Sequence, residues 1–239
     1  SEPKFYEKAG AFVLYPTVDE KFFTLDELKE KLAATQTNKD GKLVVLYASN
    51  KDAQHSYIEA AKEKGYEVFL LDSPIVSHLI QKLEADNDNL TFARVDADHI
   101  DKLIKKDEEQ LSKLSDEEKE TLKTTIEEFV PKSGYSVQLE AMDSSAAPFM
   151  ITQPEFMRRM KEMSQTGGGG MFGMGNFPDM YNLVVNTNHE LSSSILNSDD
   201  KSHQEALVKQ ALDLAKLSQN LLKGEELTAF VKRSFELIK

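Results

Sequence analysis

The sequence predicts two domains: a small three-layer αβα domain with a short parallel sheet, followed by an α+β domain that ends in a helical hairpin. Two observations support this α/β plus α+β fold class. Short β-rich runs alternate with helical segments early in the chain, whereas later strands are mixed with helices and give way to a helical tail. The 239 residues can bury two modest cores. We expect the first domain to cover residues 1–105 and the second residues 106–239.

Three short β-rich runs define the sheet of the first domain, at residues 43–48, 67–72 and 91–95. The segments between them carry apolar residues at every third or fourth position, which is the spacing of an amphipathic helix. Strand and helix therefore alternate in the order typical of βαβ units. This pattern predicts a parallel sheet that is covered by helices on both faces.

Residues that favour helix ends mark the helices of this domain. Thr24 suits an N-cap, and Glu27 three positions later completes a capping box. Gly65 lies where a left-handed C-cap would end the second helix. Pro74 suits the first turn of the third helix. Asp96 in "DADH" suits the N-cap of a fourth helix, and a metal ligand is the alternative interpretation.

The second domain begins with a charged helix and continues with three strands. Residues 101–128 lack glycine and are rich in carboxylates and lysines, and Pro131 and Gly134 end this helix. Strand-like alternation follows at residues 135–142, 147–152 and 181–186. Residues 143–145, "DSS", suit a turn between the first two strands. Everything from His189 onward is expected to be helical.

The helical tail has more apolar surface than a single buried face requires. Its first helix carries two apolar faces, and Gly224 separates it from the last helix. The hairpin either folds back on its own domain or pairs with a second copy into a four-helix bundle, and helical spacing favours neither. The residues expected between two copies are Leu207, Ala211, Leu214, Ser218 and Leu221 in the first helix and Leu227, Phe230, Val231, Phe235 and Ile238 in the last.

Composition excludes several classes of partner and chemistry. The net charge of -12 argues against nucleic acid or an anionic membrane surface as the main partner. The absence of cysteine excludes disulfides, a thiolate nucleophile and thiolate metal sites. The longest apolar runs are far shorter than the roughly 20 residues that span a bilayer. We expect a cytoplasmic protein and, because Ser1 is not preceded by methionine, a piece of a longer chain.

No motif indicates an active site. The five histidines are scattered without ligand spacing, so we expect no catalytic residue, no bound metal and no cofactor in this chain. Residues 168–173, "GGGMFG", match G-x-G-x-x-G. A dinucleotide-binding loop follows a strand and opens a helix, whereas here a helix precedes and a strand follows. We therefore reject the dinucleotide interpretation.

Residues 153–180 hold six of the eight methionines and six of the eleven glycines. Four apolar side chains share one side of a helix, with charged side chains opposite, and a glycine-rich tether follows. An ordinary helix packed on its own core is the simpler interpretation. Methionine, however, suits a surface that adapts to varied shapes. We therefore predict an adaptable apolar contact surface made of Phe156, Met157, Met160 and Met163 and, in the tether, Met171, Phe172 and Met174.

Several segments together carry a resemblance to a known family. The first are "FFTLDELKEKL", "LVVLYAS" and "YIEAAKEKGYEVFLLDSPIVSHLIQKLE". A later one is "YNLVVNTNHELSSSIL", with an N-x-x-H-x-L pattern at Asn186, His189 and Leu191. These segments resemble the heat-shock protein 90 chaperone family in its bacterial type, and the similarity covers nearly the whole chain.

The resemblance implies a role for each part of the chain. Residues up to about Lys105 would be the end of the family's middle domain, and the rest the C-terminal dimerisation domain. The last two helices would form the homodimer, and the methionine-bearing helix would contact non-native client polypeptides. ATP and magnesium would bind the full-length protein at a domain outside this sequence, so this chain should not hydrolyse ATP. The ending "FELIK" lacks the acidic peptide that recruits tetratricopeptide co-chaperones.

Two hypotheses therefore stand at the level of sequence. The first is a binding and assembly module of a chaperone, which acts without covalent chemistry. The second is a flavodoxin-like domain that binds a small ligand or carries out redox chemistry, joined to an oligomerisation tail. The absence of a phosphate-binding loop counts against the second hypothesis.

Overall fold

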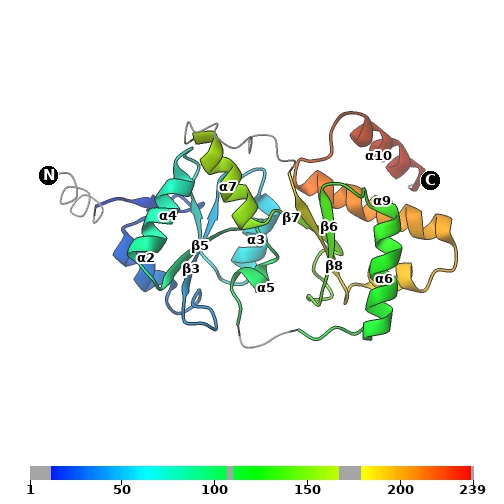
Figure 1. Ribbon diagram of the computed structural model, residues 1–239, viewed down its shortest axis with the longest axis horizontal. Helices are drawn as coiled ribbons and strands as arrows, with labels where there is room; N and C mark the ends of the chain where they lie inside the picture. Colours follow the sequence, from blue (N-terminus) through cyan, green and yellow to red (C-terminus); the bar gives the residue numbers. More distant parts are fainter. Residues whose placement is uncertain (1–11, 107–109, 167–178, 238–239) are drawn as a thin grey trace. The chain divides into compact units, whose positions relative to one another are not determined.

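The computed structural model describes residues 12–106, 110–166 and 179–237, which form two compact units (Figure 1). Residues 12–106 and 154–166 make up the first unit, and residues 110–153 and 179–237 the second. Each unit combines helices with a three-stranded sheet, which is parallel in the first unit and mixed in the second, and the first unit also holds a two-stranded antiparallel sheet. The predicted mixture of α and β structure is confirmed.

The first unit is built on a three-stranded parallel sheet in the order β4-β3-β5. Its strands are β3 (Leu43–Ala48), β4 (Val68–Leu70) and β5 (Leu90–Arg94). The register places Leu46 opposite Val68 and Leu43 opposite Leu90. Strand β3 lies in the centre and is buried on both of its faces, which explains why "LVVLYA" is continuously apolar.

Helices cover both faces of this sheet. Val45 and Tyr47 of β3 join one core cluster with residues of α2 and α4, while the alternate residues of the strand are buried on the other face. Figure 1 shows α2 and α4 on one side of the sheet and α3 and α5 on the other. The remaining elements of this unit are β1 (Tyr15–Pro16), β2 (Phe22–Phe23), α2 (Leu25–Leu32), α3 (His55–Glu63), α4 (Val76–Asp86), α5 (Ile100–Leu103) and α7 (Glu155–Thr166).

The predicted helix ends are partly confirmed. Thr24 and Glu27 form the capping box of α2, and Gly65 takes a left-handed conformation, with φ 75°, after α3. The prediction for Pro74 is wrong, because a turn from Ser73 to Val76 delays the start of α4. The prediction for Asp96 is also wrong, because its carboxylate binds the Arg94 guanidinium and α5 begins later.

The second unit is built on a mixed three-stranded sheet in the order β6-β8-β7. Strand β8 (Tyr181–Asn186) pairs in parallel with β6 (Tyr135–Glu140) and antiparallel with β7 (Phe149–Thr152). All three strands lie where the sequence predicts them. The turn expected at residues 143–145 is present as well, since Ala146 N–H donates to the Asp143 carbonyl.

Four helices complete the second unit: α6 (Asp116–Phe129), α8 (Glu190–Leu196), α9 (Lys201–Ser218) and α10 (Gly224–Leu237). The apolar face of the sheet packs against Leu122 and Ile126 of α6, Ile195 of α8 and Val208 of α9. The charged helix is shorter than predicted, because the Ser115 capping box starts it at residue 116. The tail also breaks at residues 197–200, where the expected helix is wrong, and the break expected at Gly224 lies at residues 219–223, directly before it.

Helix α7 packs with the first unit, although the strands on either side of it in sequence belong to the second. It lies beside α4 (Figure 1). None of the helices within the described ranges is long and apolar enough to cross a bilayer.

Candidate functional site

Helix α7 packs with its charged side inward and its apolar side outward. Arg158 is only 5% exposed, whereas Phe156 is 70% exposed, Met157 44% and Met160 38%. This is the reverse of an ordinary surface helix, which buries its apolar face. The helix is therefore held by polar contacts, and its apolar side is left available.

Arg158 is the centre of these polar contacts. Its Nη2 donates to Glu155 Oε1 at 2.6 Å, and its Nη1 donates to Glu162 Oε1 at 2.6 Å. Nη2 also donates to the Tyr47 hydroxyl of β3, which in turn donates to Glu155 Oε1 at 3.0 Å. The guanidinium lies 5.8 Å from the centre of the Tyr47 ring. Glu162 accepts a further hydrogen bond from the Ser77 hydroxyl of α4.

The same side of α7 covers the free edge of β5. Arg159 Nη2 donates to the Phe92 carbonyl at 2.7 Å, and Glu155 Oε2 accepts from Arg94 N–H at 3.2 Å. Glu84 of α4 accepts from Phe92 N–H at 2.7 Å and pairs with Arg159. Backbone groups on an open sheet edge can pair with foreign strands. Here charged side chains satisfy three of them.

We call this group of residues the charged cluster. It contains three guanidinium groups and four carboxylates, together with the Tyr47 hydroxyl, so its charges are nearly balanced. Its members are Tyr47, Glu84, Arg94, Asp96, Glu155, Arg158, Arg159 and Glu162.

The charges of the cluster stabilise one another. Burial raises the pKa of the Glu155 carboxyl, but Arg158 and Arg159 outweigh it and hold that pKa below the ordinary glutamate value. Burial opposes the charge of Arg158, yet Glu155 and its other partners raise the pKa of the guanidinium above normal. Burial and the nearby Glu155 also raise the pKa of the Tyr47 hydroxyl. At neutral pH Glu155, Arg158 and Arg159 are thus ionised, while Tyr47 keeps its proton.

The structure leaves much of the predicted apolar surface open. Phe156, Met157 and Met160 are exposed on α7, and Met163 is half-buried. Met171, Phe172 and Met174 lie outside the described residues. The exposure that the sequence predicts is confirmed for three side chains, while their role stays a prediction.

Those residues expected between two copies that the structure describes divide into three groups. Leu214, Ser218, Val231 and Phe235 are exposed. Leu207, Leu221 and Leu227 are half-buried, and the first two pack on the core of their own unit. Ala211 and Phe230 are buried in this chain, and Ile238 lies outside the described residues.

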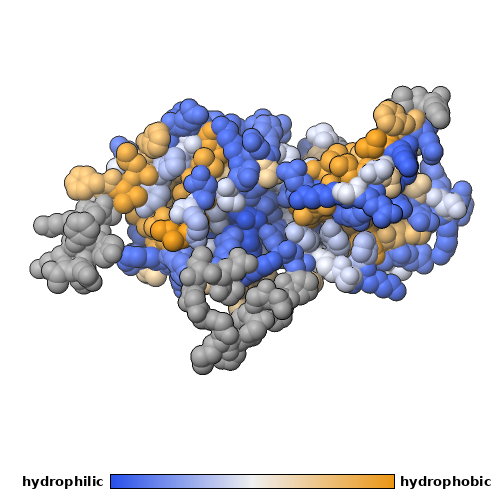
Figure 2. Space-filling model, turned by 90° about the horizontal axis from the view of Figure 1, so that it is seen from above, coloured by the Kyte–Doolittle hydropathy of each residue, from blue (hydrophilic) through white to orange (hydrophobic). Residues whose placement is uncertain are grey.

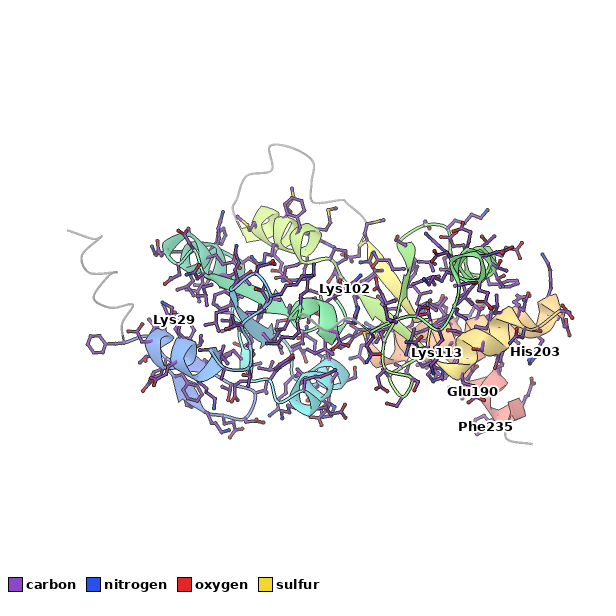
Figure 3. All side chains as sticks on the ribbon, turned by 90° about the horizontal axis from the view of Figure 1, so that it is seen from below. Lys29, Lys102, Lys113, Glu190, His203 and Phe235 are labelled. Atoms are coloured by element: carbon purple, nitrogen blue, oxygen red, sulfur yellow. The ribbon has the colours of Figure 1, made fainter. Side chains whose placement is uncertain are left out.

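Polar contacts also join α9 to α10. Arg233 donates to Asp213 at 2.6 Å and to Gln210 at 2.9 Å, and Lys216 donates to Glu226 at 2.7 Å. Figure 2 shows apolar side chains gathered over these two helices. Phe235, labelled in Figure 3, lies on α10 and is 64% exposed. The hairpin thus folds back on its own unit and still leaves apolar side chains exposed.

The pattern that carries the family resemblance has a structural role. The Asn186 side chain is fully buried, accepts from Met142 N–H at 3.2 Å and donates to the Asp143 carbonyl at 2.7 Å. His189 Nδ1 accepts from Leu191 N–H at 3.0 Å and so caps α8. These residues join β8 to α8 and to the turn after β6.

A pocket of about 230 Å³ lies beside the charged cluster, at the carboxyl ends of β3 and β4. Small-ligand sites are usually larger, roughly 300–1,000 Å³. Asp72 and Glu162 outnumber the one cation that lines the pocket, Arg158, and its loops, with Ser49 and Ser73, are not glycine-rich as a phosphate-binding loop would be. This geometry does not favour the flavodoxin-like hypothesis. Within the described ranges, no three His, Asp or Glu residues cluster as metal ligands.

Sequence reasoning missed most of the charged cluster. Glu155, Arg158, Arg159 and Glu162 are spaced three or four residues apart, a spacing that also suits ion pairs on a solvated helix face. Their partners Tyr47, Glu84 and Arg94 are distant in sequence, so spacing alone could not have found them.

Comparison with known proteins identifies clear relatives. No protein-family model matches the chain. The chain is 34% identical to "Chaperone protein HtpG" of Bacteroides thetaiotaomicron over an alignment of 305 positions, which covers 100% of this chain and 45% of that protein. It is 39% identical over 220 positions to "Chaperone protein HtpG" of Porphyromonas gingivalis, and this alignment covers 91% of this chain and 32% of that protein. The chain therefore spans less than half the length of these relatives.

Proposed function

Because the chain belongs to the HtpG chaperones of the heat-shock protein 90 family, we propose that it is the C-terminal portion of a dimeric, ATP-driven chaperone. It holds two protomers together and offers apolar surface to non-native polypeptides. Residues 1–105 are the αβα end of the middle domain, and residues 106–239 are the dimerisation domain. ATP and magnesium act elsewhere in the full-length protein, in the cytoplasm, and this chain hydrolyses no ATP.

The exposed apolar side of α7 carries the proposal for client binding. Three exposed side chains, Phe156, Met157 and Met160, lie next to one another on the outer side of α7. Hydrogen-bonded ion pairs of charged side chains hold its inner side. Contiguous exposed apolar surface marks interaction sites. Methionine adapts to many shapes, which suits clients that share no sequence.

The helical hairpin carries the proposal for dimerisation. Leu214, Leu217, Val231 and Phe235 remain exposed after α9 has buried its other face against the core. A second copy of the hairpin would cover them in a four-helix bundle, and a two-fold axis would bring the same side chains from both copies together.

We call Phe156, Met157 and Met160 the apolar stripe. Replacing its side chains tests the client-binding proposal. We expect the combined substitutions Phe156→Ser, Met157→Ser and Met160→Ser to weaken binding of an unfolded protein by at least about tenfold, since tenfold corresponds to only about 1.4 kcal/mol. The measurement is suppression of a client's aggregation as a function of chaperone concentration.

Met180→Ser is the matched control, because Met180 is also an exposed methionine, at 42%, but lies outside α7. It should leave suppression unchanged. Equal suppression by all three proteins would contradict client binding by α7.

A further inference from the structure

We propose that Arg158 is the positioning residue of α7. Arg158 holds the helix on the edge of β5, so that the apolar stripe of α7 stays helical and faces outward. The proposal rests on the proposed function of the stripe as the client-contacting surface. It adds a residue that touches no client but decides how the stripe is presented.

Helix α7 needs support from the rest of the protein. It is 12 residues long, and isolated helices shorter than about 12–15 residues are marginal in water. Most surface helices gain stability by burying their apolar face. If α7 buried its apolar face, the side chains proposed to contact clients would be hidden. Docking through the charged side stabilises the helix and leaves the stripe free.

Arg158 is the residue on which this docking depends. It is the most buried member of the cluster on α7, and it bonds to Glu155, Glu162 and Tyr47 at once. Its loss would remove the counter-charge that Glu155 and Glu162 share, which leaves Glu155 with Arg159 at 2.7 Å and Glu162 with Arg94 only at 3.7 Å. Breaking one partner of a buried ion pair is strongly destabilising, because the other charge stays uncompensated.

The edge of β5 gives the docking a defined position. Glu155 binds Arg94 N–H, and Arg159 binds the Phe92 carbonyl, so two backbone groups two residues apart set the place of α7 along the strand. Arg158 bonds to Glu155 and thereby orients one of these contacts. A change at Arg158 should therefore release both the helix and the strand edge.

Hydrogen exchange of the α7 amides tests the docking directly. In Arg158→Ala we expect these amides to exchange at least about tenfold faster, while the amides of β3 and α9 keep their rates. Arg158→Lys should give an intermediate rate, because lysine keeps the charge but lacks the planar fork that bonds two carboxylates. Lys82→Ala is the control, since it removes a surface ion pair with Asp86 from the neighbouring α4.

Binding of a permanently unfolded, alkylated protein tests the consequence. Arg158→Ala should weaken this binding several-fold, and Lys82→Ala should not change it. Unchanged exchange of α7 in Arg158→Ala would overturn the proposal. So would faster exchange with full binding, provided that the serine substitutions in the stripe weaken binding.

The two proposals fail in different ways. If the serine substitutions in the stripe leave binding unchanged, the proposed function of the stripe fails. Faster exchange confined to α7 in Arg158→Ala would then still support Arg158 as the residue that positions the helix.

Discussion

At the scale of single residues, buried polar side chains hold separate segments of this protein together through hydrogen bonds. Asn186 and Arg158 are almost completely buried, and each bonds to groups from segments that are distant in sequence. Burial of a polar group is costly unless the group is paired, because an unpaired one loses its hydrogen bonds to water without compensation. Such residues specify the arrangement of elements more sharply than apolar contacts do.

Asn186→Ala should destabilise the second unit by about 1–3 kcal/mol, because Met142 N–H and the Asp143 carbonyl lose their partner. Urea unfolding followed by circular dichroism measures the change. Asn197→Ala, which alters an exposed asparagine at the end of α8, should stay within about 0.5 kcal/mol. Similar losses for both variants would contradict the role given to Asn186.

At the scale of elements, α7 and the α9–α10 hairpin both leave apolar side chains exposed, but they are held in different ways. Charged side chains hold α7, whereas α9 buries an apolar face in the core of its unit and adds polar contacts to α10. Polar contacts are directional and need correct geometry, so they fix the position of a helix. Apolar contacts are not directional, which suits surfaces that meet different or mobile partners.

The docking of α7 should depend on pH through Glu155. Arg158 and Arg159 lower the folded-state pKa of this carboxyl, and Tyr47 and the backbone N–H of Arg94 face it from β3 and β5. A lowered pKa contributes stability that is present above the unfolded value, about 4.3 for glutamate, and is lost as the pH falls through the folded value.

We therefore expect the difference in unfolding free energy between the unchanged chain and Glu155→Gln to be constant above about pH 5 and to shrink below about pH 4. Glutamine keeps the shape of the side chain but has no charge to lose. Urea unfolding at a series of pH values measures the difference. A difference that does not change with pH would show that the charge of Glu155 does not stabilise the unit.

At the scale of the whole molecule, the exposed hairpin predicts a homodimer. Sedimentation should find the chain dimeric at micromolar concentration. Leu214→Glu combined with Phe235→Glu should raise the dissociation constant by at least about a hundredfold, since two charges would enter an apolar interface at about 1.4 kcal/mol or more each.

Ile75→Glu is the matched control for the dimer, because Ile75 is an exposed apolar residue, at 63%, in the first unit. It should leave the dissociation constant unchanged. A monomeric chain at micromolar concentration, or a double variant that dimerises as tightly as the unchanged chain, would contradict dimerisation through the hairpin.

Local patterns predicted the strands and several helix ends. The central strand β3 could be predicted because its burial on both faces requires a continuous apolar run. The caps at Thr24 and Gly65 could be predicted because each depends on residues within one turn. Asp96 could not be assigned from the sequence, because the Arg94 guanidinium competes with the helix N-terminus for its carboxylate. The strength of this ion pair depends on burial, which the local sequence does not show.

The sequence by itself determined the strand and helix pattern, the methionine stripe and the resemblance to heat-shock protein 90, because these depend on residues close together in the chain. Only the tertiary structure decided which side of α7 faces inward. That choice depends on Tyr47, Glu84 and Arg94, which come from three other elements and meet α7 only in the folded unit. An amphipathic helix has two sides that can dock, and the surface opposite it determines which one does.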